Sequence, residues 1–183
     1  MKIIKEEIAF QWKIIEVIQQ TVKLWTHERV WEIARRSPWV RLIVCEGDKI
    51  LLTKEYRSEV DTVDYRLPGG KVFDTLIEYN KNKSDIENHA LIAVQRECEE
   101  ETWLIPQEIS LYHISKVWAT IERDLYYYVI TKFTHHEKWQ QLELGEEIEV
   151  EWKDNKEILD IIKAWEMHED RSVGVLMRYL LRK

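Results

Sequence analysis

Two stretches of this 183-residue chain decide its organisation: Leu67-Pro68-Gly69-Gly70-Lys71-Val72 and Arg96-Glu97-Cys98-Glu99-Glu100-Glu101. The second lies within residues 85–102, which contain no Gly or Pro and therefore predict one long helix. We expect this helix to begin near Ser84, with Glu87 as the partner residue of a capping box. A turn built from two glycines thus precedes an acidic helix.

One face of the predicted helix is acidic, because Glu97, Glu100 and Glu101 are spaced to share it. Like charges at that spacing repel, so the face is either solvated or shares a cation. Hard cations such as Mg²⁺ take carboxylate and phosphate oxygens as ligands. Another stripe of the helix is apolar and is expected to face the core: Ala90, Leu91, Val94 and Cys98.

The turn and the helix together resemble the Nudix hydrolase signature. Adjacent glycines allow positive φ and a close approach of the backbone to a ligand. The signature reads Gly, five residues, Glu, seven residues, then Arg-Glu-hydrophobic-x-Glu-Glu-x-Gly-hydrophobic. Gly70 matches its opening glycine, and its second half matches Arg96, Glu97, Cys98, Glu100, Glu101 and Leu104. The chain from about Trp25 onward is similar to the ADP-ribose pyrophosphatase branch, because Lys54-Glu55-Tyr56-Arg57 precedes the turn.

The sequence departs from this signature in three places. Extra residues lengthen the interval between Gly70 and Arg96, and Asn88 stands where the first Glu is expected. Trp103 replaces the late glycine and tolerates a left-handed conformation poorly, so we expect the helix to end differently. The insertion at 74–88 is expected to be a surface loop, with a lid over the substrate as the alternative.

The rest of the chain predicts one domain of the α+β class, a sandwich with helices on either side of a mixed sheet, as the resemblance also implies. Within it, residues 1–36 are expected to form an N-terminal antiparallel section and residues 37–183 the catalytic core. The pattern leaves residues 1–11 open between a short helix and a frayed end. Strands and helices are expected at these positions: strands 12–24, 30–36, 40–45, 49–56, 109–121, 124–133 and 148–152, and helices from 155 and from 171.

Composition limits the classes of partner. A net charge of −7 argues against a nucleic-acid partner, which would require a basic surface. No stretch has the length of a membrane span, and no secretory signal precedes the domain, so a cytoplasmic protein is expected. Cys45 and Cys98 form no metal or disulfide pattern and are read as small core residues. The resemblance implies a homodimer built through the N-terminal section, although the residues themselves indicate only a hairpin.

The resemblance also implies roles for the matching residues. Glu97 and Glu101 would be the principal ligands of Mg²⁺, or of Mn²⁺ as an alternative, with Glu100 a further ligand or the general base. The family pattern adds the backbone carbonyl of Gly69 as a ligand. Arg96 is expected to orient a carboxylate, because its planar fork suits paired hydrogen bonds.

Residues outside the signature complete the expected site. In the ADP-ribose pyrophosphatase branch an acidic loop residue approaches the water nucleophile, and Glu147, with Glu146 in reserve, matches it best. Arg57 and Arg66 are candidates for holding substrate phosphate, with ordinary salt bridges as the alternative. Gly70 is expected to let the substrate approach. One of the consecutive tyrosines at 126–128 could stack on a base, although packing in the core is the commoner role.

The predicted reaction is Mg²⁺-dependent hydrolysis of a nucleoside diphosphate linked to another group, which yields two monophosphates. ADP-ribose is the first choice of substrate. Because Arg66 stands where that branch has an acidic residue, other nucleotide sugars and dinucleotides remain open. Two rival readings are a Nudix-like nucleotide-binding module without catalysis and a structural domain whose acidic helix face is only solvated.

Overall fold

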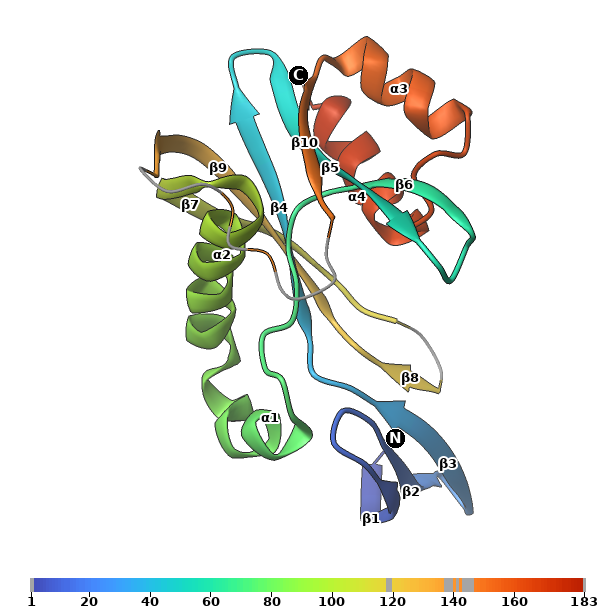
Figure 1. Ribbon diagram of the computed structural model, residues 1–183. Helices are drawn as coiled ribbons and strands as arrows, with labels where there is room; N and C mark the ends of the chain where they lie inside the picture. The colour runs from blue at the N-terminus through green and yellow to red at the C-terminus, as the bar shows by residue number, and fades with distance from the viewer. Residues whose placement is uncertain (1, 118–119, 137–139, 141, 143–146, 183) are drawn as a thin grey trace.

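The computed structural model describes the chain apart from residues 1, 118–119, 137–139, 141, 143–146 and 183 (Figure 1). The strands are β1 Lys2–Gln11, β2 Glu16–Leu24, β3 His27–Arg35, β4 Trp39–Glu46, β5 Lys49–Arg57, β6 Thr62–Arg66, β7 Leu104–Ser115, β8 Ile121–Glu122, β9 Leu125–His135 and β10 Glu149–Lys153. The helices are α1 Leu76–Asn82, a short 3₁₀ turn η1 Lys83–Asp85, α2 Ile86–Thr102, α3 Asn155–Lys163 and α4 Asp170–Leu180.

The central sheet is mixed and runs in the order β10-β5-β4-β9-β7, with β6 also paired to β5. Strand β4 is parallel to β9, whereas the other pairs are antiparallel. Helix α2 covers one face, and α3 and α4 cover the other (Figure 1). The predicted α+β sandwich is therefore confirmed.

Strand β4 shows how the apolar pattern produces these layers. Val40 and Leu42 pack in the core under α2, whereas Ile43 packs in the core under α3 and α4. A strand with both faces covered needs apolar residues at successive positions, and this explains why residues 40–45 are apolar apart from Arg41. The tyrosines of β9 alternate in the same way. Tyr126 and Tyr128 lie in the first core and Tyr127 in the second, so all three serve packing.

The N-terminal section forms a separate sheet in the order β1-β2-β3-β8. Residues 2–11 are a strand paired antiparallel to β2, so both expected alternatives, a short helix and a frayed end, are wrong. The hairpin between β2 and β3 turns at Trp25, whose φ is 50°, so β3 already begins at His27, earlier than expected.

The insertion at 74–88 is helical, so the expected surface loop is wrong. Thr75 caps α1 through a capping box with Glu78, because each side chain bonds the other's backbone N–H. The backbone N–H of Leu76 donates to the Lys13 carbonyl at 2.9 Å. Asn80 Nδ2 donates to Glu16 Oε2 at 3.5 Å, so the insertion joins the N-terminal sheet to the core.

Helix α2 differs from expectation at both ends. Its N-cap is Asp85, which makes no side-chain cap hydrogen bond, so the capping box predicted for Ser84 and Glu87 is absent. At the other end Trp103 has φ 49° and ψ 25°, and its N–H donates to the Glu99 carbonyl at 3.2 Å. Trp103 thus ends the helix in the left-handed conformation that glycine would adopt, contrary to our expectation.

The buried stripe of α2 differs from the predicted one at a single residue. Ala90, Val94 and Cys98 are buried as expected, but Leu91 is 38% exposed and Ala93 takes its place at 1%. The next helix begins as predicted, with Asp154 as its N-cap, and ends at Lys163. None of the described helices combines the length and apolar character that crossing a membrane would require.

Candidate functional site

The glycine turn lies against the first half of β4, which β5 leaves uncovered. Leu42 N–H donates to the Pro68 carbonyl at 2.8 Å, and Val40 N–H donates to the Gly70 carbonyl at 2.9 Å. Gly69 has φ 133°, and a Cβ there would stand 2.3 Å from the Val40 carbonyl oxygen. A glycine is required at this position because the backbones pass too closely for a side chain.

Gly70 leaves room for the Glu97 carboxylate. A Cβ built on Gly70 would lie 2.5–2.6 Å from the carboxyl atoms of Glu97. The Glu97 side chain is only 12% exposed. Burial raises the pKa of the Glu97 carboxyl, and the Arg96 guanidinium opposes that rise. The structure thus brings the turn and the helix together at these two residues.

Arg96 connects the turn to two of the predicted carboxylates. Its Nη2 donates to the Lys71 carbonyl at 2.6 Å and to Glu97 Oε1 at 2.6 Å. Its Nε lies 3.6 Å from Glu100 Oε2, where both side chains are 40% exposed. These contacts are suited to holding the carboxylates in a fixed orientation.

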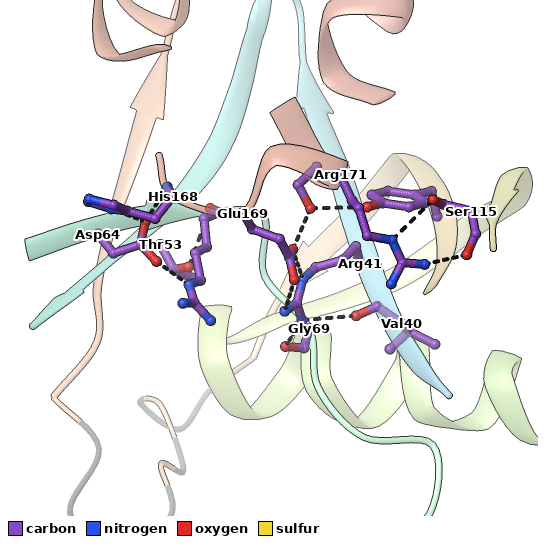
Figure 2. A network of polar contacts seen from close by, with 12 residues as sticks. Val40, Arg41, Thr53, Asp64, Gly69, Ser115, His168, Glu169 and Arg171 are labelled. Atoms are coloured by element: carbon purple, nitrogen blue, oxygen red, sulfur yellow. Dashed lines mark hydrogen bonds and ion pairs between the residues drawn. The ribbon is translucent and has the colours of Figure 1, made fainter. Parts of the chain in front are cut away.

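Glu101 bonds the turn directly, because Gly69 N–H donates to Glu101 Oε2 at 2.8 Å. The Gly69 carbonyl accepts a hydrogen bond from Arg41 Nη1 at 2.7 Å (Figure 2). The carbonyl oxygen has two lone pairs, so this bond leaves it one further site as an acceptor. The signature residues of the turn and of α2 therefore form one contiguous cluster.

The oxygen atoms that this cluster offers as metal ligands suit a hard cation. The three glutamates of the acidic face and the Gly69 carbonyl offer only oxygen atoms, as Mg²⁺ prefers. The poorly solvated Glu97 would gain more from a nearby cation than a solvated carboxylate would. In the part of the chain that the structure describes, no three acidic, imidazole or thiol groups converge closely enough to hold a metal ion.

Glu147 lines an open cavity of about 580 Å³. The cavity is lined by Lys54, Glu55, Tyr56, Val63, Leu142, Glu147, Ile148 and Glu149. Gln140 Nε2 donates to the Ile148 carbonyl at 3.2 Å and also to the Glu101 carbonyl, so this segment reaches the end of α2. Glu146, the reserve candidate, lies outside the described residues.

The two candidate phosphate ligands are paired within their own strands. Arg57 Nη2 lies 2.6 Å from Glu55 Oε2 in β5, and Arg66 Nε bonds Asp64 in β6. Arg57 Nε is buried and finds no hydrogen-bond acceptor among the described residues. A buried donor without an acceptor is costly, so Arg57 has capacity for a further oxygen.

A buried polar network behind the turn was missed by the sequence analysis. Figure 2 shows Arg41 between Gly69 and Glu169, and Asp64 beside His168. His168 donates its backbone N–H to Asp64 at 2.8 Å, and its Nδ1 lies 3.1 Å from the same oxygen. One signal was available: Arg41 is a charged residue within an otherwise apolar strand, and such residues are rarely buried without a partner.

The comparisons with known proteins agree with this geometry. The family model of the NUDIX domain matches residues 35–173. A crystal structure of an ADP compounds hydrolase is similar with a TM-score of 0.72 and 14% identity, covering 99% of this chain and 94% of that one. At that identity the likeness concerns the fold. A search of curated proteins found no match. The chain therefore belongs to the NUDIX domain family.

Proposed function

We propose that this protein hydrolyses a nucleoside diphosphate linked to another group, in a Mg²⁺-dependent reaction that releases two monophosphates. ADP-ribose is the first substrate to test. The observation that carries the proposal is the contact between the Gly70 turn and the buried Glu97 carboxylate, with Arg96 bonded to both segments. The likeness to an ADP compounds hydrolase supports an ADP derivative as the substrate.

Four groups would hold the cation, namely the carboxylates of Glu97, Glu101 and Glu100 and the carbonyl of Gly69. Because the three carboxylates do not converge on one point in the described residues, their side chains would have to move together on binding. Mg²⁺, or Mn²⁺ in its place, would neutralise pyrophosphate charge and lower the pKa of a bound water. The Gly69 N–H keeps Glu101 against the turn, at 2.8 Å. Glu97, held at 2.6 Å by Arg96, stays beside Gly70.

Other side chains would act on the substrate itself. Arg57, whose side chain is 29% exposed, would bind a phosphate oxygen, and Arg66 would contribute positive charge near the turn. Gly70 would contribute to substrate binding through its backbone, because the Glu97 carboxylate fills the space that a side chain would take. Glu147 or Glu100 would accept the proton of the attacking water.

We also propose that the protein is a homodimer joined through the N-terminal sheet. Strand β1 lies at the edge of that sheet and exposes Ile4, Ile8 and Phe10 at 44%, 57% and 46%. Apolar groups gathered on an edge strand are typical of an association surface. Sedimentation equilibrium would give twice the monomer mass of 22.3 kDa, and a monomer at micromolar concentration would contradict this part.

The experiment measures monophosphate release from a panel of nucleoside diphosphate derivatives, with and without Mg²⁺. We expect turnover that requires Mg²⁺ and falls at least about 100-fold in Glu97→Gln and in Glu101→Gln, the scale of a misplaced catalytic group. Glu99→Gln makes the same charge change on the same helix outside the acidic face, and it should keep activity.

Each alternative result has a clear meaning. Nucleotide binding without turnover of any compound would support the rival reading of a binding module. Turnover that survives both substitutions would show that the acidic face of α2 does not carry the chemistry.

A further inference from the structure

The two peptide groups that flank Gly69 are held from opposite faces of the sheet. On the α2 side, Gly69 N–H donates to Glu101 Oε2 at 2.8 Å. On the α4 side, the Gly69 carbonyl accepts from Arg41 Nη1 at 2.7 Å (Figure 2). Glycine is the residue with the greatest backbone freedom. The two hydrogen bonds therefore fix a backbone conformation that no side chain restricts.

Arg41 is fully buried, with 2% of its surface exposed. Its Nε donates to Glu169 Oε2 at 2.7 Å and its Nη2 to Glu169 Oε1 at 3.1 Å. Its Nη1 also donates to the Val40 carbonyl at 3.2 Å. The guanidinium is thus fixed by paired bonds on one side and presents Nη1 to Gly69 on the other.

Glu169 makes this arrangement electrically neutral. It is the N-cap residue of α4, and its side chain, 12% exposed, also accepts a hydrogen bond from Ser172 at 2.5 Å. Arg41 alone would place an uncompensated positive charge beside the Gly69 carbonyl. With Glu169 present, Arg41 keeps its hydrogen bond to Gly69 while its charge is balanced within the same pair.

Stability alone is a weak reason for such a pair. Replacing a buried ion pair with apolar groups of similar volume is often neutral or stabilising, because two charges must be desolvated to form the pair. The position of the pair offers a better reason, since Nη1 bonds the one carbonyl that the proposed function assigns to the cation.

We propose that Arg41 and Glu169 form a positioning pair, which fixes the Gly69 carbonyl from behind and thereby sets the affinity of the site for its divalent cation. The pair touches neither substrate nor cation and acts through the turn. This inference rests on the proposed function. Partners of this kind around metal ligands typically change metal affinity by about 10- to 100-fold when they are removed.

The test measures the Mn²⁺ dissociation constant of the nucleotide-free protein by titration calorimetry. The key variant is Arg41→Met with Glu169→Leu, which removes both charges and retains volume, so that the protein keeps its fold. We expect its Mn²⁺ dissociation constant to rise at least about tenfold, while its urea midpoint stays close to that of the wild type. Glu169→Gln leaves Arg41 uncompensated and should weaken Mn²⁺ binding at least as much.

Arg171→Met is the matched control. Arg171 lies in the same network and donates to the Ser115 side chain at 3.2 Å and to the Arg123 carbonyl at 3.0 Å, but it makes no bond to Gly69. Its loss should leave the Mn²⁺ dissociation constant unchanged. Turnover gives a second readout, because excess Mg²⁺ should restore kcat in the double variant, whereas general damage to the core would not respond to Mg²⁺.

The results separate the two levels of the argument. If the double variant binds Mn²⁺ within about twofold of the wild type, the positioning role is wrong while the proposed function stands. If Arg171→Met weakens binding equally, the effect belongs to the core in general and the inference is again overturned. If the wild-type protein binds no Mn²⁺ and releases no monophosphate, the proposed function fails and this inference fails with it.

Discussion

Alanine substitution at the two adjacent glycines should lower activity at Gly70 and stability at Gly69, because their surroundings differ. At Gly70 the new Cβ would lie 2.5 Å from Glu97 Oε2, a side-chain atom. Restoring an ordinary contact of 3.4 Å requires the carboxylate to move by about 0.9 Å. Gly70 has no positive φ, so its backbone accepts alanine without strain. The substitution should therefore displace the Glu97 carboxylate and leave the backbone unchanged.

At Gly69 the same change meets the backbone of β4. The Cβ would lie 2.3 Å from the Val40 carbonyl oxygen, and φ is 133°, where L-residues are strained. The strained conformation alone costs about 1–3 kcal/mol, and the overlap with fixed backbone adds to it. We therefore expect Gly69→Ala to unfold the protein or to destabilise it by at least about 3 kcal/mol.

The assay combines kinetics with urea unfolding. Gly70→Ala should lower kcat/KM for the preferred substrate about 100-fold, because a misplacement of about 1 Å has an effect of that size. Its unfolding midpoint should remain near that of the wild type. Gly174→Ala in α4 is the control and should change activity little, since a Cβ there meets no atom of the described residues within 4 Å. Full activity in Gly70→Ala would refute the reasoning that the space at Gly70 positions Glu97.

Two further predictions concern stability. Burial by itself would raise the pKa of Glu169, but the Arg41 guanidinium and the Ser172 hydroxyl lower this pKa from 4.5 to about 2. The ionised Glu169 therefore stabilises the fold above pH 4.5, and this contribution is lost as the pH falls toward 2. Urea unfolding should show that the free energy of unfolding of the wild type falls by about 3 kcal/mol between pH 5 and pH 2. This fall should be absent in the double variant Arg41→Met with Glu169→Leu. An equal fall in the two proteins would contradict this assignment. Thr75→Ala removes the capping box of α1 and should lower the free energy of unfolding by about 1 kcal/mol. Thr131→Ala is the control, because this exposed side chain caps no helix and its loss should lower the free energy of unfolding less.

Local patterns predicted much of the fold. The apolar run at 40–45 predicted a strand buried on both faces, and β4 is such a strand. Alternation along a strand places Tyr127 on the face opposite Tyr126 and Tyr128, and the two cores show this arrangement. These features depend on the period of a strand and on burial, and both are properties of neighbouring residues.

The errors arose where a propensity competes with tertiary packing. Trp103 adopts a left-handed conformation that its own preference opposes, because the chain must leave α2 and enter β7 at the buried Leu104. The insertion became α1 because Thr75 and Glu78 cap it. The Thr-x-x-Glu pattern of Thr75 and Glu78 indicates this cap, whereas Ser84, where a cap was expected, lies in a 3₁₀ turn.

The sequence by itself determined the family signature, the acidic face of α2 and the two glycines, since each follows from residue type and short spacing. Only the tertiary structure decided what these residues contact. Arg41 and Glu169 are 128 positions apart, and the turn, β4 and α4 meet only after the sheet has formed. A pattern along the chain reports periodicity and local conformation, whereas the partner of a buried charge depends on which distant segment the fold brings beside it.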